Sequence, residues 1–506
     1  MACVIQIPEL VSEICGHICP GPESDDLNEW YLPDEEKSST LLNLALACRG
    51  SCHAALDRLW WGMDDLTPLF MLIPGFSVGP PGFFTSNLDS ATDFTRFDLY
   101  ASRIRYYNCV KREKILPAAY FQLIRARSYQ ALLPGLRYVY SQVASPELHL
   151  LLSDSLRTLY IRNIHTPGTS HTTVLAWTSI YALPAVAPKL EILELGKEIY
   201  VTADIVDTIS VMQHLKQLRL MSETLSIEDH ILDTADLIKL GKIATLTHLV
   251  LNGGLHFFDE PPSEMMNPLF PALEHLEIHA DVANIISDVN KLLALLGRRK
   301  RLRQLSLMAD SNIVTSTLYR TRLQEGLKSL FRFLRRNTVS FSSIFISVPK
   351  LHAPIQPAHF TDLLALRLTK LEMPEKFFDT LRHEDFVLIA DTWPNLEVLR
   401  IDAKRWLTDF HTLIHLAEKL PHLQELYLAL RVRRLPNPRD VPKLLHPLQM
   451  LQIVTVDHSA EPPSLFGELL SNIFLSSGLS CENSEGRQSD WERQVIKSSE
   501  THWRHR

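Results

Sequence analysis

The most regular feature of the chain is a short hydrophobic pattern, L-x-x-L-x-L, in which Ile or Phe can replace a Leu. Its last two apolar positions are two residues apart, and alternate side chains of a β-strand point to the same face. Each copy therefore predicts a short strand with one buried face. Eleven copies begin at positions 156, 190, 215, 246, 273, 302, 341, 363, 396, 423 and 448, with a mean spacing of about 29 residues.

Between the copies, apolar residues recur at the spacing of a helix, as at Ile205, Ile209 and Met212. A strand and a helix cannot bury a core alone, so neighbouring repeats must stack on one another. The sequence therefore predicts an α/β solenoid with parallel strands on its concave face and helices on its convex face. Because the spacing of the copies varies from 22 to 39 residues, we expect the solenoid to be irregular.

The N-terminal region has a different pattern, with three stretches of helical spacing. The first has apolar residues at positions 7, 10, 11 and 14, with Pro8 near the start of the expected helix. Two more stretches follow before position 62. The expected organisation is a helical region at 1–75 with an acidic insertion at 20–39, a connecting segment at 76–135, repeats at 136–475 and a polar tail at 476–506.

Composition limits the chemistry further. The chain has 506 residues, 84 of them Leu, and a net charge of −7, which argues against binding nucleic acid through bulk charge. Its seven cysteines include no C-x-x-C pair, so we expect free thiols in an intracellular compartment, cytoplasmic or nuclear. The first 18 residues lack the charged start of a signal peptide. No apolar run reaches the roughly 20 residues of a membrane span, so we expect no membrane partner.

Residues 136–475 resemble the leucine-rich-repeat family, which has the strand-and-helix architecture expected above. One departure concerns the position three residues after the last apolar one, where the family places Asn or Cys. Here that position is never Asn or Cys, and it is occupied for example by Glu198 and Asp281. This departure also favours an irregular array.

The N-terminal region resembles an F-box. Ile7-Pro8 and Glu9 match its opening, a Leu-rich stretch ends in Cys48-Arg49, and a third stretch ends in Leu59-Trp60, although the acidic residue stands one place early. The order of the two regions is similar to that of F-box/leucine-rich-repeat proteins, especially divergent fungal ones. The resemblance implies the substrate-recognition subunit of a Skp–cullin–F-box E3 ubiquitin ligase, which binds the Skp-type adaptor and through it the cullin. The adaptor-binding residues would be Ile7, Pro8, Leu10, Val11, Ile14, Leu41, Leu44, Cys48, Leu56, Leu59 and Trp60.

A simpler alternative is that the N-terminal helices only cap the solenoid. The apolar side chains near the N-terminus have little chain nearby to cover them, which favours a partner protein. The matching alternative for the whole chain is a leucine-rich-repeat scaffold or inhibitor that binds a protein without ubiquitination.

A target protein, which the sequence does not identify, is expected to bind the strand positions between the apolar ones. Their mixed charges and aromatic rings suit a protein better than a phosphate backbone, so no nucleic-acid partner is expected. The expected target-binding residues are Tyr160, Glu194, Arg219, Glu277, Phe345, Arg367, Arg400 and Tyr427.

Catalytic motifs are missing from the sequence, including G-x-S-x-G, G-x-x-x-x-G-K-[ST] and H-E-x-x-H. His248, His275, Glu274 and Glu277 fall on neighbouring expected strands and are the best set for a shared cation. The interpretation that the sequence favours is that they are solvated residues of a strand face. We therefore expect a protein that is not an enzyme, with no cofactor and no metal site.

Overall fold

The computed structural model describes most of the chain in two compact units, residues 1–246 and residues 247–506. The structure describes residues 7–19, 34–79, 82–85, 88, 92–109, 115, 117–142, 146–162, 171–196, 199, 201–221, 232–252, 269–281, 285–296, 301–310, 317–348, 361–432, 435–444, 446–456, 462–474, 478–483 and 493–499. Of the expected acidic insertion at 20–39, residues 20–33 lie outside these ranges. Residues 35–39 are helical, so the second N-terminal helix begins inside the expected insertion.

Unit 1 begins with helices and continues as a parallel sheet. Its helices are α1 (Pro8–Ile18), α2 (Glu35–Ala47), α3 (Arg49–Leu59), α4 (Thr67–Phe70), α5 (Thr95–Ala101), α6 (Pro117–Ala126), α7 (Pro146–Leu151), α8 (His171–Val186), α9 (Ala203–Ser210) and α10 (Thr234–Leu240). Its strands are β1 (Gly62–Met63), β2 (Phe76–Gly79), β3 (Gly82–Thr85), β4 (Tyr106–Cys109), β5 (Tyr138–Ser141), β6 (Thr158–Ile161), β7 (Ile192–Leu195) and β8 (Gln217–Met221). Strands β2 and β3 form an antiparallel hairpin, whereas the others pair in parallel in the order β1-β4-β5-β6-β7-β8.

Unit 2 repeats the same arrangement of strands and helices. Its strands are β9 (His248–Asn252), β10 (His275–Asp281), β11 (Gln304–Asp310), β12 (Ser343–Ser347), β13 (Lys370–Arg382), β14 (Val398–Leu407), β15 (Glu425–Arg431), β16 (Met450–Val456) and β17 (Gly478–Asn483). Its helices are α11 (Ile285–Leu296), α12 (Thr317–Asn337), α13 (Thr361–Leu364), α14 (His383–Thr392), α15 (Phe410–Lys419) and α16 (Pro463–Ile473). The nine strands are parallel and lie in sequence order.

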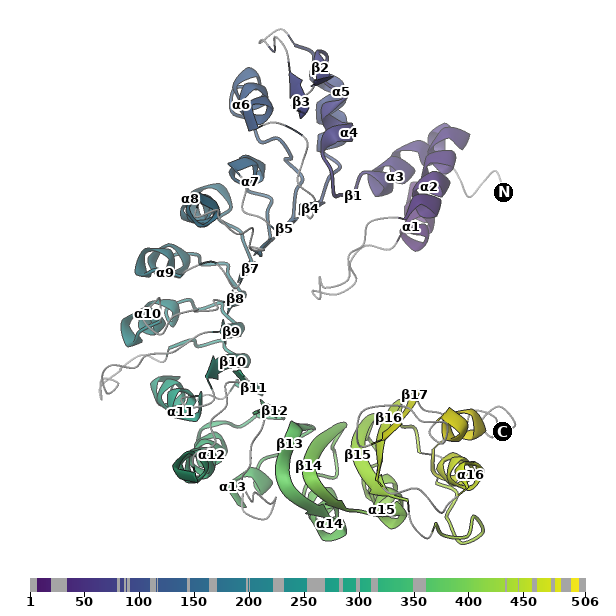
Figure 1. Ribbon diagram of the computed structural model, residues 1–506. Coiled ribbons are helices and arrows are strands. Elements are labelled where there is room, and N and C mark those ends of the chain that lie inside the picture. The colour runs from purple at the N-terminus through teal and green to yellow at the C-terminus, as the bar shows by residue number, and fades with distance from the viewer. Residues whose placement is uncertain are drawn as a thin grey trace. The chain divides into compact units, whose positions relative to one another are not determined.

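The parallel strand-and-helix architecture that the leucine pattern predicts is confirmed within each unit. Ten of the eleven copies coincide with a parallel strand, and their apolar positions pair with one another, as Leu193 does with Leu159 and Leu218. In unit 1, helices α6 to α10 lie along one side of the strands (Figure 1). The inward-facing leucines are buried between the strands and these helices.

Backbone hydrogen bonds repeat from one strand to the next and fix this register. The N–H of the first strand residue and that of the residue before it both donate to one carbonyl of the preceding repeat. In unit 1, Arg137 and Tyr138 donate to the carbonyl of Arg105 at 2.8 and 2.9 Å, and the same pair of bonds recurs along both sheets. Equivalent side chains of neighbouring strands therefore stand side by side in rows.

The copy predicted at positions 363, 366 and 368 is wrong. Those residues lie in α13 and the turn after it, and the strand positions are filled instead by Leu371 and Met373. Both positions of the strand fit the hydrophobic spacing, so the local sequence pattern does not distinguish between the two. The choice is made by neighbouring strands, because Leu371 pairs with Ile344 on one side and Leu399 on the other.

The expected boundaries of the repeats are also corrected. Strand β4 lies in the segment expected to be a connection, and β5 follows it as its parallel neighbour. Their inward positions hold Tyr107 and Val139 rather than Leu, so a leucine pattern does not detect them. Beyond position 475, β17 pairs with β16, and residues 493–499 are helical with Val495 buried, so the expected polar tail is partly a further repeat.

Candidate protein-binding surfaces

The three N-terminal helices pack around a small core of their own. Its buried residues include Val11, Cys15, Leu41 and Ala55. Val11 and Leu41, both expected to contact the adaptor, are therefore corrected to core residues, because a side chain buried in this cluster cannot also contact a partner. Three other residues of the expected set pack against the core and are partly buried: Leu44, Leu56 and Leu59.

Helix α1 has a wider apolar arc than its neighbours cover. At 3.6 residues per turn, its apolar residues span about 140° of the helix surface. The Val11 and Cys15 side faces the core, whereas Ile7, Leu10 and Ile14 are 44%, 39% and 46% exposed. These three residues, spaced three and four apart, form an apolar ridge, which we call the α1 ridge. Pro8 at the first turn starts the helix beside this ridge.

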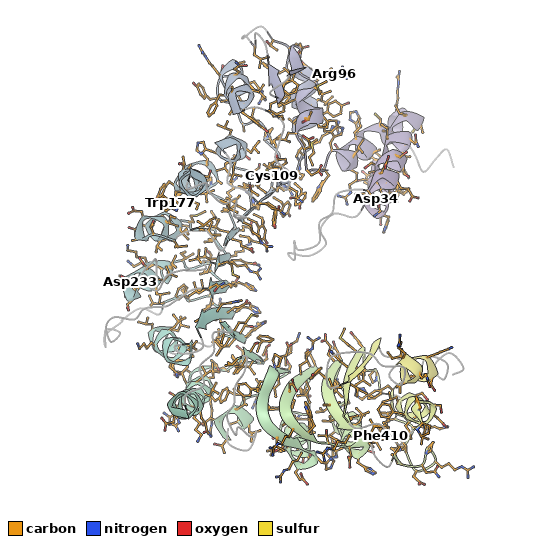
Figure 2. The ribbon with its side chains drawn as sticks, viewed as in Figure 1. Asp34, Arg96, Cys109, Trp177, Asp233 and Phe410 are labelled. Carbon is orange, nitrogen blue, oxygen red and sulfur yellow. The ribbon has the colours of Figure 1, made fainter. Side chains whose placement is uncertain are left out.

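Helix α2 also carries two exposed leucines. Asp34, which is labelled in Figure 2, caps this helix. Its side chain accepts a hydrogen bond from the Lys37 N–H at 2.8 Å. Leu42 and Leu46 lie one turn apart on α2 and are exposed, although the sequence comparison with the F-box pattern selected Leu41 and Leu44. Their four-residue spacing places both leucines on the same face of α2, but only the packing of the three helices shows that this face is exposed.

Ser51 joins α2 to α3 and was not singled out from the sequence. It is fully buried, and its hydroxyl donates to the carbonyl of Leu44 at 2.6 Å. Cys48, an expected adaptor contact, caps α3 instead by accepting a hydrogen bond from the Ser51 N–H. Hydrogen bonding from the Ser51 side chain and backbone lowers the pKa of the Cys48 thiol.

Helix α3 and Trp60, which follows it, are fixed to α5 and to the segment that leads from α5 into β4. Trp60 lies against Tyr100 of α5, with ring centroids 4.7 Å apart, and Arg103 forms an ion pair with Asp57 and donates to the His53 carbonyl. Trp60 was expected to contact the adaptor, and the structure places one side of its ring in this internal contact. The helical cluster is therefore held to the repeats by side chains as well as by the chain itself.

The face of the unit 1 sheet opposite helices α6 to α10, which we call the strand face, carries four tyrosines in two neighbouring rows, Tyr106 with Tyr138 and Tyr140 with Tyr160. Tyr106, Tyr138, Tyr140 and Tyr160 alternate with the inward positions of β4, β5 and β6. The rings of Tyr140 and Tyr160 lie 6.1 Å apart, and Trp61 stacks on Tyr106 at 5.8 Å. Burial, together with the neighbouring Tyr140 and Tyr160, raises the pKa of the Tyr106 hydroxyl.

Next to the tyrosines, one buried carboxylate binds two arginines. The Glu194 side chain is 4% exposed, and its Oε1 accepts from Arg162 Nε at 3.0 Å while its Oε2 accepts from Arg219 Nη1 at 3.4 Å. The arginine side chains are 42% and 41% exposed. Three of the expected target-binding residues, Tyr160, Glu194 and Arg219, thus stand side by side in one row, and Arg162 is a partner that the sequence did not identify. Tyr160 and Glu194 are buried, so Arg219 is the exposed residue of the three.

In unit 2, four expected target-binding residues also share a row. Glu277, Phe345, Arg400 and Tyr427 occupy equivalent positions of β10, β12, β14 and β15. Arg400 bridges two carboxylates, since its Nη2 lies 2.7 Å from Glu425 and its Nη1 3.7 Å from a glutamate of β13.

That glutamate is Glu372, and it corrects the expectation for Arg367. Arg367 lies before β13 rather than in it, and Glu372 occupies the row position between Phe345 and Arg400. Burial raises the pKa of Glu372, and the neighbouring Glu425 raises it further while Arg400 lowers it. The error follows directly from the misplaced copy at position 363.

The candidate cation set is divided among separate contacts. The rings of His248 and His275 stack at 4.1 Å, Glu277 accepts from His279 at 2.5 Å, and Glu274 pairs with Arg303 at 3.7 Å. Within the described ranges no cluster of His, Cys, Asp or Glu has the arrangement of a metal site. In the same ranges, no helix has both the length and the apolar composition needed to cross a bilayer.

Comparisons with known proteins leave the family open. No family model matches the chain, and no curated protein matches it. Among solved structures, an internalin from Listeria monocytogenes is 13% identical over 90% of this chain and 96% of that chain, with a TM-score of 0.31. A score this low supports no conclusion, so the fold assignment depends on the strand order and register described above.

Proposed function

We propose that the chain is the target-binding subunit of a Skp–cullin–F-box ubiquitin ligase. In this proposal the α1–α3 cluster docks on the Skp-type adaptor, and the strand faces hold a target protein. The observation that carries the proposal is the α1 ridge, Ile7, Leu10 and Ile14, on a helical cluster that already has its own core. A helix that only capped the solenoid would need one covered face, and this helix has a second apolar face to cover.

The mechanism would be proximity rather than catalysis by this chain. A target held on the strand faces brings its lysines near the conjugating enzyme that the adaptor and cullin position, which raises their effective concentration. The Trp60–Tyr100 and Arg103–Asp57 contacts support this mechanism, because they connect the adaptor-binding cluster to α5 and to the segment that leads from α5 into β4.

The test is capture of a purified Skp-type adaptor by the full chain and by a Leu10→Asp/Ile14→Asp variant. Both positions are exposed, so the variant should fold normally, but a charge buried against the adaptor should weaken binding by about tenfold or more. Val339→Asp provides the matched control, since Val339 is an equally apolar side chain that is 77% exposed in unit 2.

Binding by the wild type and the Val339 variant, with loss in the α1 variant, would support the ligase subunit. If the folded wild type does not bind the adaptor, or if the α1 variant binds as well as the wild type, the proposal is wrong. The first of these results would favour the second candidate, a scaffold without a role in ubiquitination. The exposed arginines of the strand face, Arg162 and Arg219, support that candidate equally, since arginine is enriched where proteins bind one another.

A further inference from the structure

The part of the unit 1 sheet formed by β4 to β8 is positively charged although the whole chain is negative. Eight charged residues lie in strands β4 to β8 or directly beside their ends within the described ranges. Six are cationic and two anionic, a net charge of +4 against −7 for the chain. They are Arg105, Arg137, Arg157, Arg162, Glu191, Glu194, Lys216 and Arg219. Burial and the nearby Arg137 lower the pKa of Arg105, so cations are close enough there to repel one another.

The strongest local arrangement is the pair of arginines on Glu194. The carboxylate is buried and each arginine side chain is about two-fifths exposed, so the carboxylate holds two guanidinium groups at the surface. Arg162 directs Nε and Nη2 toward Glu194, and Arg219 directs Nη1. A guanidinium has five N–H groups, so each arginine retains donors beyond those that Glu194 accepts. The three side chains together have a net charge of +1.

An apolar area lies beside the arginines. Tyr140, Tyr160 and Ile192 form one cluster on the strand face, and the Arg162 guanidinium lies 5.5 Å from the centre of the Tyr140 ring. This contact fixes the Arg162 plane against an aromatic ring, which reduces the freedom it would lose on binding. The three side chains of the cluster are each less than a tenth exposed, so the cluster supports Arg162 from one side and leaves the guanidinium groups as the surface that a ligand can reach.

We infer that Arg162 and Arg219 bind side-chain carboxylates of an acidic segment in the target protein, with Glu194 as the residue that positions them. The inference deepens the proposed function, because it names the chemistry of the target that the strand face would hold. Charge complementarity supports an acidic occupant. The Glu194 contacts show that both guanidinium groups already donate to a carboxylate in this structure.

The test uses the full chain and a fluorescein-labelled copolymer of glutamate and tyrosine, with a lysine–tyrosine copolymer as the charge-reversed probe. The variant is Arg162→Gln/Glu194→Gln/Arg219→Gln, which removes both guanidinium groups without leaving the buried carboxylate unpaired. The same strands offer a matched control, Arg157→Gln/Glu191→Gln/Lys216→Gln, because Glu191 also lies between two cations, 3.8 Å from Arg157 and 2.6 Å from Lys216. Both variants lower the net charge by the same amount.

We expect the glutamate–tyrosine copolymer to bind the wild type at low ionic strength. The net charge of −7 attracts the lysine–tyrosine copolymer to the chain, and its binding should be no weaker in the Glu194 triple variant than in the wild type. The Glu194 triple variant should bind the glutamate–tyrosine copolymer about tenfold more weakly, and the Glu191 control should stay within about threefold of the wild type. In the wild type, the glutamate–tyrosine copolymer should also protect Arg162 and Arg219 from phenylglyoxal, a readout by mass spectrometry that needs no variant.

Equal weakening in the two triple variants would indicate diffuse attraction and overturn the site, as would unchanged binding or unprotected arginines. Neither readout involves the adaptor, so a failure here is distinct from a failure of adaptor capture. A chain that binds the copolymer but not the adaptor would keep this inference and lose the ligase role.

Discussion

The Glu194 cluster predicts an asymmetry in stability that depends on which partner is removed. Glu194→Gln removes the buried charge, whereas Arg162→Gln/Arg219→Gln leaves it in place without a cation. The structure makes the two changes unequal because the carboxylate side chain is 4% exposed and the arginine side chains are about ten times more exposed.

The expected magnitudes follow from those exposures. After Glu194→Gln the arginines remain hydrated, and the loss is close to that of surface ion pairs, about 1 kcal/mol or less. After the double arginine substitution, an ionised carboxylate is buried without compensation, which costs about 3–5 kcal/mol. The triple variant Arg162→Gln/Glu194→Gln/Arg219→Gln should lose an amount of stability closer to that of Glu194→Gln than to that of the double arginine variant, because it leaves no buried charge unpaired.

The assay is hydrogen exchange on peptides that cover β6, β7 and β8, because it measures local opening within unit 1. Urea unfolding followed by circular dichroism gives the global comparison, although two units need not unfold in one transition. The matched pair at Glu191, which is 36% exposed, should show no such asymmetry, since Glu191→Gln and Arg157→Gln/Lys216→Gln each remove contacts that water can replace.

The reasoning is refuted if Glu194→Gln destabilises β6–β8 as much as the double arginine variant does. That result would mean that the two ion pairs, rather than the burial of the carboxylate, determine the local free energy. An equally large asymmetry at Glu191 would also refute it, because Glu191 is far more exposed.

Three further predictions concern other contacts. Burial lowers the pKa of His446, whose Nε2 donates to the Leu420 carbonyl at 2.8 Å. As the pH falls through the ordinary histidine pKa, the unfolded chain is therefore protonated before the folded chain. The free energy of unfolding of unit 2 should decrease between pH 8 and pH 5, and His446→Asn should make this decrease smaller. Trp393→Phe removes the indole N–H that donates to the Leu366 carbonyl at 2.8 Å. The indole nitrogen of Trp406 has no hydrogen bond among the described residues, so Trp393→Phe should lower the free energy of urea unfolding by about 1–3 kcal/mol more than Trp406→Phe does. Equal losses in the two variants would contradict this. Ser51→Ala should lower the stability of the α1–α3 cluster by about 1 kcal/mol, seen as faster exchange in α2 and α3, and an unchanged exchange rate would show that the Leu44 bond contributes nothing.

The sequence by itself determined the repeating architecture and the three N-terminal helices. Both are local patterns, because strand and helix periods are set by neighbours two to four residues apart. Leucine marks the inward positions of most strands, so ten predicted copies coincide with strands. The three helical stretches predicted before position 62 correspond to α1, α2 and α3, although α2 begins at Glu35, inside the expected insertion.

The tertiary structure decided which residues form a strand where the local pattern allowed more than one choice or gave no signal. At position 363 the leucine spacing fits two registers, and pairing of Leu371 with Ile344 and Leu399 selects the later one. Strands β4 and β5 carry Tyr107 and Val139 in place of Leu, and only their parallel pairing shows that they are repeats.

The candidate sites depend on contacts between distant parts of the chain. The sequence identified the apolar residues of α1, but the packing of α2 and α3 decides that Val11 is core and that Ile7, Leu10 and Ile14 are surface. Likewise the sequence placed Glu194 on a strand face, and the fold brings to it Arg162, 32 residues earlier, and a second arginine from the next strand. Periodicity specifies which face a side chain takes, whereas burial and charge pairing arise only when separate repeats are stacked.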